Sequence, residues 1–383
     1  MQQYWTTADA LFIVLCLACV ALVGWGFTGP NRSLRFASLM GASIAGFILP
    51  QVYGLNKARA VPEGAMEMFI VVALTCMVCA FAGDAWGYRH PGGGLRRMAV
   101  YDERRVTEAA LLLMCVTAFV TYLSQVVFAE EIARRTNTQG GMSGPMVIVI
   151  FFQAVHRYGY ALALLLYWRR RTALTLILAL FGAFNYLVVV ILFARRAPAM
   201  EFVFITLLTF ALVRRKKIPA ILITALFVGG TLWSTSVDHF RASDMGFIEK
   251  VETADFIKSF EDTLDRGGAE VRNGCEVIWA TSEDGAYEYG KIHWNKLVHA
   301  YFPGQIFGHQ TKEDLKFDIE DIADQNNRRR GTVGITPTGM ADCFTSFGYF
   351  GGLKYLLIGY VMGRWYRRAF QGDLAAQLTY STL

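Results

Sequence analysis

Long apolar runs alternate with short polar turns along the first 237 residues of the chain, and one further run lies near the C-terminus. The runs extend over about 17–22 residues, enough for a helix to cross a hydrocarbon core of about 30 Å. The pattern therefore predicts nine membrane-spanning helices, over residues 9–28, 34–54, 66–83, 107–128, 145–168, 172–194, 198–213, 218–237 and 345–363.

This pattern also predicts the organisation of the chain. We expect an all-α polytopic integral membrane protein in four parts: an eight-helix transmembrane bundle over 1–237, an extracytoplasmic loop region over 238–344, a ninth transmembrane helix over 345–368, and a C-terminal tail over 369–383. The tail contains "LAAQLTYSTL", which has the pattern of the start of another helix. We therefore expect further C-terminal helices, which a shortened protein or an incomplete copy would lack.

The composition supports a membrane protein. The chain has 383 residues, of which 54% are hydrophobic and only 18% are charged, whereas soluble proteins average about 25% charged residues. No basic segment precedes the first apolar run and no small-residue cleavage site follows it, so we expect a retained helix rather than a signal peptide.

Basic residues are unevenly divided between the short loops. One alternate set of loops carries 17 lysines and arginines, and the intervening set carries 6. The positive-inside rule then places the first set in the cytoplasm and the N-terminus outside. The region 238–344 also lies outside, and it is acidic, with 12 basic and 20 acidic residues. The net charge of +6 therefore reflects topology anchors and does not indicate a nucleic-acid surface.

Arg195 and Arg196 stand at an outer turn, against the positive-inside bias. They can extend to lipid phosphates, or they can form an anion site. We favour the anion site because Pro198 suits the first turn of a helix, whose N-terminus attracts negative charge, and because guanidinium groups match phosphate geometry. Glu201, in that turn, either complements the helix dipole or holds one arginine in place.

Two further basic residues lie inside predicted membrane helices. A buried arginine costs at least about 2.5–3.5 kcal/mol unless it is paired or hydrated. Arg157, beside His156, is therefore a candidate ligand for a buried anion; the alternative is an internal ion pair with Asp84 or another acid. Lys354, near the start of the ninth helix, is expected to snorkel towards the membrane surface.

The acidic outer region holds several candidate polar residues. His299, His309 and Lys312 lie in an aromatic-rich stretch, and Asp342 precedes the last helix. Arg328, Arg329 and Arg330 form either a solvated surface or a second anion clamp. The histidines have no regular metal-ligand spacing, so no metal site is expected. Cys275 and Cys343 are the cysteines that could pair if this region is extracytoplasmic, and the sequence leaves that open.

Three short motifs resemble the Wzy-type repeat-unit polymerases of bacterial O-antigens and exopolysaccharides, over roughly residues 185–365. They are the "ARRA" turn, similar to a G-R-R element; "YFPGQIFGHQTK"; and "TPTGMADCFTSFGYFGG", which resembles P-x-G-x-x-E-x-x-x-N-F-G-x-x-G. In the family pattern the acid is commonly Glu and the residue before F-G is often Asn. This chain has Asp342 and Ser346 at those positions.

The resemblance implies a GT-C-like glycosyltransferase in the bacterial inner membrane that needs no cofactor and no metal. It would join undecaprenyl diphosphate-linked oligosaccharides on the periplasmic face, with lipid diphosphate as the leaving group. Besides the lipid bilayer, the partners to expect are these lipid-linked glycans, with chain-length regulator and flippase proteins as further possibilities, and no nucleic acid.

The resemblance also suggests roles for individual residues. Fixed positive groups should stabilise the leaving diphosphate, and the candidates are Arg195, Arg196, Arg157, Arg328, Arg329, Arg330 and Lys312. A base must take the acceptor hydroxyl proton. His309 is the first choice because a neutral imidazole works near pH 7, followed by Asp342 and Glu201.

Two other functions compete with polymerisation. A glycan ligase would use the same kind of site to move finished chains onto another acceptor. A transporter or flippase for an anionic lipid or solute would explain Arg157 and His156 in mid-helix, but the chain shows no inverted repeat and has a long outer region.

Overall fold

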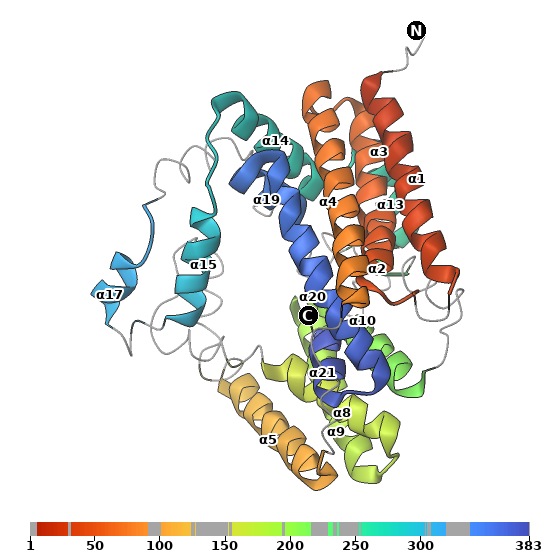
Figure 1. Ribbon diagram of the computed structural model, residues 1–383, viewed down its shortest axis with the longest axis vertical. Helices are drawn as coiled ribbons and strands as arrows, with labels where there is room; N and C mark the ends of the chain where they lie inside the picture. The colour runs from red at the N-terminus through yellow and green to blue at the C-terminus, as the bar shows by residue number, and fades with distance from the viewer. Residues whose placement is uncertain are drawn as a thin grey trace. The chain divides into compact units, whose positions relative to one another are not determined.

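The structure is a computed structural model, and every secondary-structure element in its described part is a helix. That part comprises residues 6–29, 32–90, 101–123, 155–193, 196–215, 229–232, 255–302, 308–318 and 338–382, with positions 127, 152, 236, 253 and 304. The chain divides into two compact units. Unit 1 contains Met1–Pro91 and Ile218–Arg364; unit 2 contains Gly92–Lys217 and Trp365–Leu383. Figure 1 labels the helices of both.

Four helices are long and apolar enough to cross a membrane: Thr7–Phe27, Phe36–Ala58, Glu63–Arg89 and Glu103–Tyr122. By length and composition they support membrane association, and they correspond to the runs expected at 9–28, 34–54, 66–83 and 107–128. Helices are also present within the expected spans 145–168, 172–194 and 198–213, whereas 218–237 lies mostly outside the described residues. Nine crossings remain a prediction.

The second apolar helix is continuous but irregular. It comprises α2 (Phe36–Ser43), a π-helical segment (Ile44–Ile48) and α3 (Leu49–Ala58). Pro50 lacks the N–H that would bond the Gly46 carbonyl four residues earlier, and such a gap commonly coincides with irregular helix. The Thr231 hydroxyl donates to that carbonyl at 2.8 Å. The Gly46 carbonyl is therefore satisfied by a side chain from a distant part of unit 1.

Two helices of unit 1 approach each other closely enough for their backbones to touch. On α4 (Glu63–Arg89), Gly83 and Gly87 lie against the backbone of α20 (Leu353–Gln371), where Gly359 and Gly363 lie against the backbone of α4. A β-carbon on Gly359 would lie 2.5 Å from the Ala80 carbonyl oxygen. Both pairs have the small-xxx-small spacing that allows membrane helices to pack closely.

A buried ion pair lies beside this crossing. Asp84 of α4 is fully buried and its Oδ2 lies 2.8 Å from an Nη atom of Arg35, whose side chain is 7% exposed. The same Nη donates to the Asp84 carbonyl oxygen at 2.9 Å. The guanidinium also faces the rings of Trp25 and Tyr88, at 4.8 and 4.2 Å from their centroids. Arg35 is therefore a buried structural cation, although the sequence indicated a loop anchor.

The polar region after residue 254 packs on these helices. An amphipathic helix, α13 (Phe256–Arg266), packs on α3, where Gly54 lets the two backbones touch. The next helix, α14 (Ala269–Asp284), packs on α4 and on α19 (Gly339–Phe347). Figure 1 shows α14 and α19 together at one end of α4. This region is therefore part of the core of unit 1.

Unit 2 has its own helical core. It contains α5 (Glu103–Tyr122), α8 (Val155–Arg169), α9 (Ala173–Phe193), α10 (Arg196–Arg214) and α21 (Leu374–Thr382). The tail expected to begin a helix is helical, and α21 packs on α8 and α10. Gln377 anchors it by donating to the carbonyls of Leu212 and Ala369, at 3.3 and 3.0 Å.

We predict that Gly359→Ala destabilises the protein. The new β-carbon would meet the Ala80 carbonyl, and overpacking of this kind costs about 1–3 kcal/mol, more than the gain of about 0.5–1 kcal/mol in helix propensity. Thermal unfolding in detergent would measure the effect. The matched control is Gly24→Ala on α1 (Thr7–Phe27), where a β-carbon meets nothing within 4 Å. Equal melting temperatures for the two variants would contradict the close backbone contact between α4 and α20.

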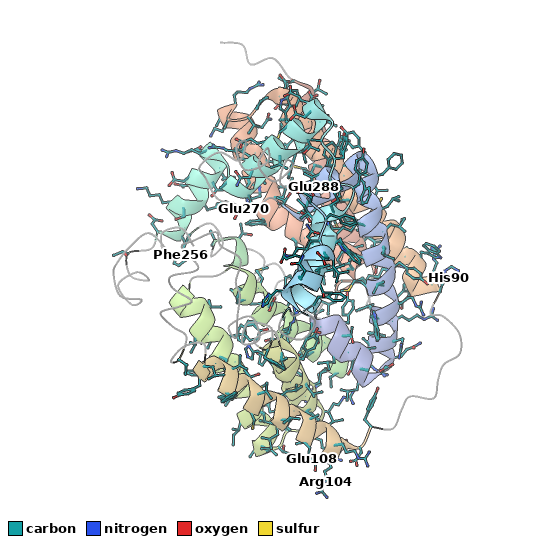
Figure 2. All side chains as sticks on the ribbon, turned by 90° about the vertical axis from the view of Figure 1, so that its left-hand side faces the viewer. His90, Arg104, Glu108, Phe256, Glu270 and Glu288 are labelled. Carbon is teal, nitrogen blue, oxygen red and sulfur yellow. The ribbon has the colours of Figure 1, made fainter. Side chains whose placement is uncertain are left out.

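We predict that Asp84→Asn lowers stability by about 3–5 kcal/mol, because it leaves the Arg35 guanidinium buried without its counter-charge. The control is Glu108→Gln on α5. Glu108 pairs with Arg104 on the surface, where the two side chains are 60% and 86% exposed (Figure 2), and surface pairs contribute little. The double variant Arg35→Met/Asp84→Leu should recover much of the loss. A melting temperature for Asp84→Asn equal to that of the control would contradict this role.

Candidate functional site

Three ionisable side chains from three helices of unit 1 meet at one point. His293 is on α15 (Lys291–Tyr301), Asp342 is on α19, and Lys354 is in the first turn of α20. The Lys354 Nζ lies 2.7 Å from His293 Nε2, and Asp342 Oδ2 lies 3.1 Å from the same nitrogen. Lys354 and Asp342 are themselves 3.6 Å apart. We call these three residues the His293 cluster.

The His293 cluster is accessible from outside the protein. The side chains of His293, Asp342 and Lys354 are 31%, 23% and 40% exposed. They are therefore neither a fully buried ion pair nor freely solvated surface charges. A substrate can reach them, and the partial burial strengthens their mutual interactions relative to bulk water.

Ser346 binds the opposite nitrogen of the imidazole. Its hydroxyl donates to the Asp342 carbonyl oxygen at 3.1 Å, and its oxygen lies 3.2 Å from His293 Nδ1. Because the hydroxyl proton is directed at the carbonyl, the oxygen can accept from an Nδ1–H. The geometry therefore favours a neutral imidazole with its proton on Nδ1, leaving Nε2 to accept from the Lys354 ammonium.

Local backbone geometry brings Asp342 and Lys354 together. The Thr338 hydroxyl caps α19 by accepting from the Ala341 N–H at 3.3 Å, and α19 ends at Gly348, where φ is +59°. A 3₁₀ turn (Gly348–Gly352) then leads into α20. Gly351 packs directly on the Cys343 carbonyl, where a side chain would not fit. This break is why α20 begins at Leu353, whereas the apolar pattern predicted a membrane helix from residue 345.

A second backbone connection fixes His293. The N–H groups of Glu288 and Tyr289 donate to the carbonyls of Thr345 and Ser346, at 2.9 and 3.0 Å. Glu288 is 2% exposed, and Figure 2 labels it within the dense side-chain packing of this unit. The segment that leads into α15 is thereby held along α19, so the imidazole reaches Asp342 and Ser346.

The two cysteines of the polar region 238–344 are free thiols. Cys275 on α14 and Cys343 on α19 are both buried. Burial raises the pKa of Cys343 to about 11 and also raises the pKa of Cys275. Both side chains are therefore protonated near neutral pH, and the pairing that the sequence left open is not formed.

Two other candidates from the region 238–344 lie on a separate short helix. His309 begins α17 (His309–Asp314) and is exposed, whereas Lys312 on the same helix is 9% exposed. His299 is on α15, but its side chain lies outside the described structure. Within unit 1, Asp342 is therefore the sequence candidate that the structure brings into the His293 cluster.

The membrane-helix candidates of unit 2 form a second polar group. The Tyr186 hydroxyl of α9 donates to Glu201 Oε2 of α10 at 3.3 Å. On α8, His156 Nε2 lies 3.1 Å from the Gly182 carbonyl oxygen, and its ring centroid lies 4.4 Å from that of Tyr186 with the planes tilted by 38°. The Arg157 guanidinium lies over the Tyr158 ring at 5.4 Å, and its buried Nε has no hydrogen-bond partner in the described structure.

Several predictions fall outside the described residues. These are Arg195, Arg328, Arg329, Arg330 and the side chain of Arg196, whose backbone begins α10. Asp84, which the sequence offered with other acids as a partner for Arg157, is paired with Arg35 within unit 1. Lys354 contacts His293 and Asp342, although it was expected to snorkel to the membrane surface.

Sequence reasoning missed His293 and the contact role of Ser346. His293 belongs to no motif, and 61 residues separate it from Lys354. One signal was available, because Asp342 and Ser346 stand four residues apart and would share one face of a helix. That face needs a partner, and a histidine elsewhere in the same outer region is a reasonable candidate.

The chain matches no family model, no curated protein and no solved structure. Its function is therefore argued from the residues and their geometry.

We predict that Lys354→Met changes the tautomer of His293. The Ser346 geometry favours an imidazole proton on Nδ1 in the native chain, with Nε2 accepting from Lys354. Without the ammonium, Asp342 Oδ2 still lies 3.1 Å from Nε2, so the proton should move to Nε2 and donate to the carboxylate. ¹⁵N NMR of histidine-labelled protein at pH 8 would distinguish the two forms. The control is Lys57→Met, which removes a surface partner of Asp265. An Nε2–H tautomer in the native chain would contradict the assignment.

Proposed function

We propose that the chain is a membrane glycosyltransferase of the bacterial inner membrane that polymerises undecaprenyl diphosphate-linked oligosaccharides into a surface or secreted polysaccharide. The observation that carries the proposal is the His293 cluster. Asp342 and Ser346, which both contact His293, lie within the stretch that resembles the Wzy-type motif, where they replace the commoner Glu and Asn of the family pattern. A carboxylate and an amine beside one imidazole nitrogen, His293 Nε2, suit proton transfer from an acceptor hydroxyl.

In this proposal His293 is the general base. The acceptor hydroxyl displaces Lys354 from Nε2 and gives its proton to that nitrogen. Asp342 then stabilises the imidazolium through Oδ2, which already lies 3.1 Å from Nε2. Ser346 keeps the ring oriented through Nδ1. A positioned base of this kind contributes about 10²–10⁴ in rate.

The bond changes follow from the proposed substrates. The acceptor oxygen forms a bond to the anomeric carbon of the donor glycan as its proton passes to His293. The bond from that carbon to the diphosphate oxygen breaks, and its electron pair leaves with undecaprenyl diphosphate. The growing chain is thereby transferred to the incoming unit, with no change in oxidation state.

The leaving diphosphate needs fixed positive charge. We assign this role to Arg195, Arg196 and Arg157, with Arg328–Arg330 and Lys312 as further candidates. The support is chemical: Arg157 has a buried Nε without a hydrogen-bond partner in the described structure, and a guanidinium fork matches phosphate oxygens. Glu201 accepts from Tyr186, so we assign it a structural role in that unit.

The same chemistry would serve a glycan ligase, and Arg157 and His156 would also suit a transporter of anionic lipid. We favour glycosyl transfer over transport because the His293 cluster provides a proton acceptor that transport does not need, and we favour polymerisation over ligation because the motifs resemble those of Wzy-type polymerases. The proposed topology has the region 238–344 in the periplasm, and the proposed partners include flippase and chain-length regulator proteins.

We predict that His293→Gln abolishes polymer, because glutamine cannot accept the hydroxyl proton. The surface or secreted glycan of cells that carry each variant would be separated on a gel, with membrane abundance confirmed by immunoblot. His293→Gln and Asp342→Asn should leave only single repeat units. The matched control is His90→Gln at the end of α4, where the imidazole contacts the Trp86 carbonyl (Figure 2).

Either of two results would contradict this assignment. Polymer of normal length from His293→Gln would exclude His293 as the base. Loss of polymer in His309→Gln, with His293→Gln unaffected, would move the base to α17, as the sequence first suggested.

A further inference from the structure

Two exposed aromatic side chains lie close in sequence to residues of this site: Tyr289 precedes His293 by four residues, and Phe347 directly follows Ser346. Tyr289 is 67% exposed and Phe347 is 51% exposed. Their ring centroids lie 6.5 Å apart and the ring planes meet at 71°. Tyr287 continues the group, 6.3 Å from Tyr289. Tyr287 and Tyr289 lie in the segment that leads into α15, the helix of His293. Phe347 is the last residue of α19, the helix of Ser346.

The backbone holds Tyr289 in an unusual conformation. Its φ is +48°, and Gly290, the next residue, has a φ of +80°. A tyrosine rarely adopts a positive φ, and such residues cluster at functional sites. The Tyr289 N–H donates to the Ser346 carbonyl oxygen at 3.0 Å, which fixes the residue while its ring stays exposed. The Tyr289 ring is therefore exposed on a backbone that is bonded to Ser346, the residue whose hydroxyl contacts His293.

Polar side chains that contact the imidazole and exposed aromatic side chains lie next to each other in the sequence. Ser346, which contacts His293, is followed directly by Phe347, and Tyr289 is bonded to the Ser346 backbone. An acyl chain can cover the rings but leaves the nearby imidazole, carboxylate and ammonium without partners. A pyranose ring offers both surfaces, because its C–H face matches the negative face of an aromatic ring and its hydroxyls can bond the charged groups.

We propose that Tyr289 and Phe347 form a stacking subsite for a pyranose ring of the acceptor glycan. The inference rests on the proposed function, because it names the sugar contact of that same site. One C–H face of the ring lies on the aromatic side chains, and the hydroxyls at its edge point towards His293. The subsite binds and orients the acceptor and takes no part in proton transfer.

The first test measures kinetics with the purified full chain in nanodiscs. The probe is the lipid-linked repeat unit extracted from cells that lack the polymerase. Tyr289→Ala and Phe347→Ala should each raise the KM for this unit about tenfold and leave kcat within about threefold. Tyr289→Phe retains the ring and should raise the KM much less than Tyr289→Ala does. The control is Phe317→Ala, which removes a 52% exposed ring that packs on Trp294. An unchanged KM in both alanine variants overturns the proposal.

A second measurement does not depend on polymerisation. Saturation-transfer NMR would use methyl glucoside, methyl galactoside and methyl mannoside with the same nanodiscs. We expect transfer to at least one glycoside, lost in the Tyr289→Ala/Phe347→Ala variant and kept in Phe317→Ala. That result supports the subsite even if the native chain makes no polymer, which would reject the proposed function alone. No transfer to any of the three overturns the subsite, as does equal transfer to the native chain and the double variant.

The same variants would also reveal lipid headgroups, instead of a sugar, at these rings. If the rings lie in lipid headgroups, the double variant should change tryptophan quenching by brominated lipid and leave both sugar measurements unchanged. That outcome overturns the stacking subsite and assigns the rings to the membrane interface.

Discussion

The close contact between α4 and α20 is the constraint on which the arrangement of unit 1 depends. Backbones can touch there because Gly83, Gly87, Gly359 and Gly363 carry no side chain. The same contact encloses Asp84, whose backbone lies against Gly359 and Gly363 and whose carboxylate is the partner of Arg35. One crossing therefore fixes two helices and buries one ion pair.

The His293 cluster depends on that crossing through α20. Lys354 stands in the first turn of this helix, and the glycine-rich 3₁₀ turn before it packs on α19 and, at Gly352, on Thr75 of α4. The position of the ammonium relative to Asp342 is therefore set by backbone packing. The Lys354 ammonium and the Asp342 carboxylate both lie within hydrogen-bond distance of His293 Nε2. This arrangement suits a site where a hydroxyl gives its proton to the imidazole, because the carboxylate balances the charge of the imidazolium that forms.

The sequence predicted the elements that depend on length and apolarity. Helices α1, α4 and α5 follow their apolar runs, because burying a helix of that length in lipid requires little beyond apolar side chains. The sequence also pointed to Asp342. It could not predict the partner of that residue, because the approach of His293 depends on the positive φ at Tyr289 and Gly290 and on backbone bonds to α19.

Arg35 illustrates the same limit. A basic residue just before an apolar run looks like a topology anchor, and its burial requires an acid 49 residues later to reach it. Such pairings depend on helix packing, which periodicity alone does not specify.

The most direct test of the central claim is a reaction of purified native protein in nanodiscs, with undecaprenyl diphosphate-linked repeat unit as both donor and acceptor. Mass spectrometry would follow glycan length and free lipid diphosphate. The proposed function predicts lipid-linked dimers and longer chains, with one undecaprenyl diphosphate released for each bond formed. Intact repeat units that change leaflet without any new bond would contradict it and identify a transporter.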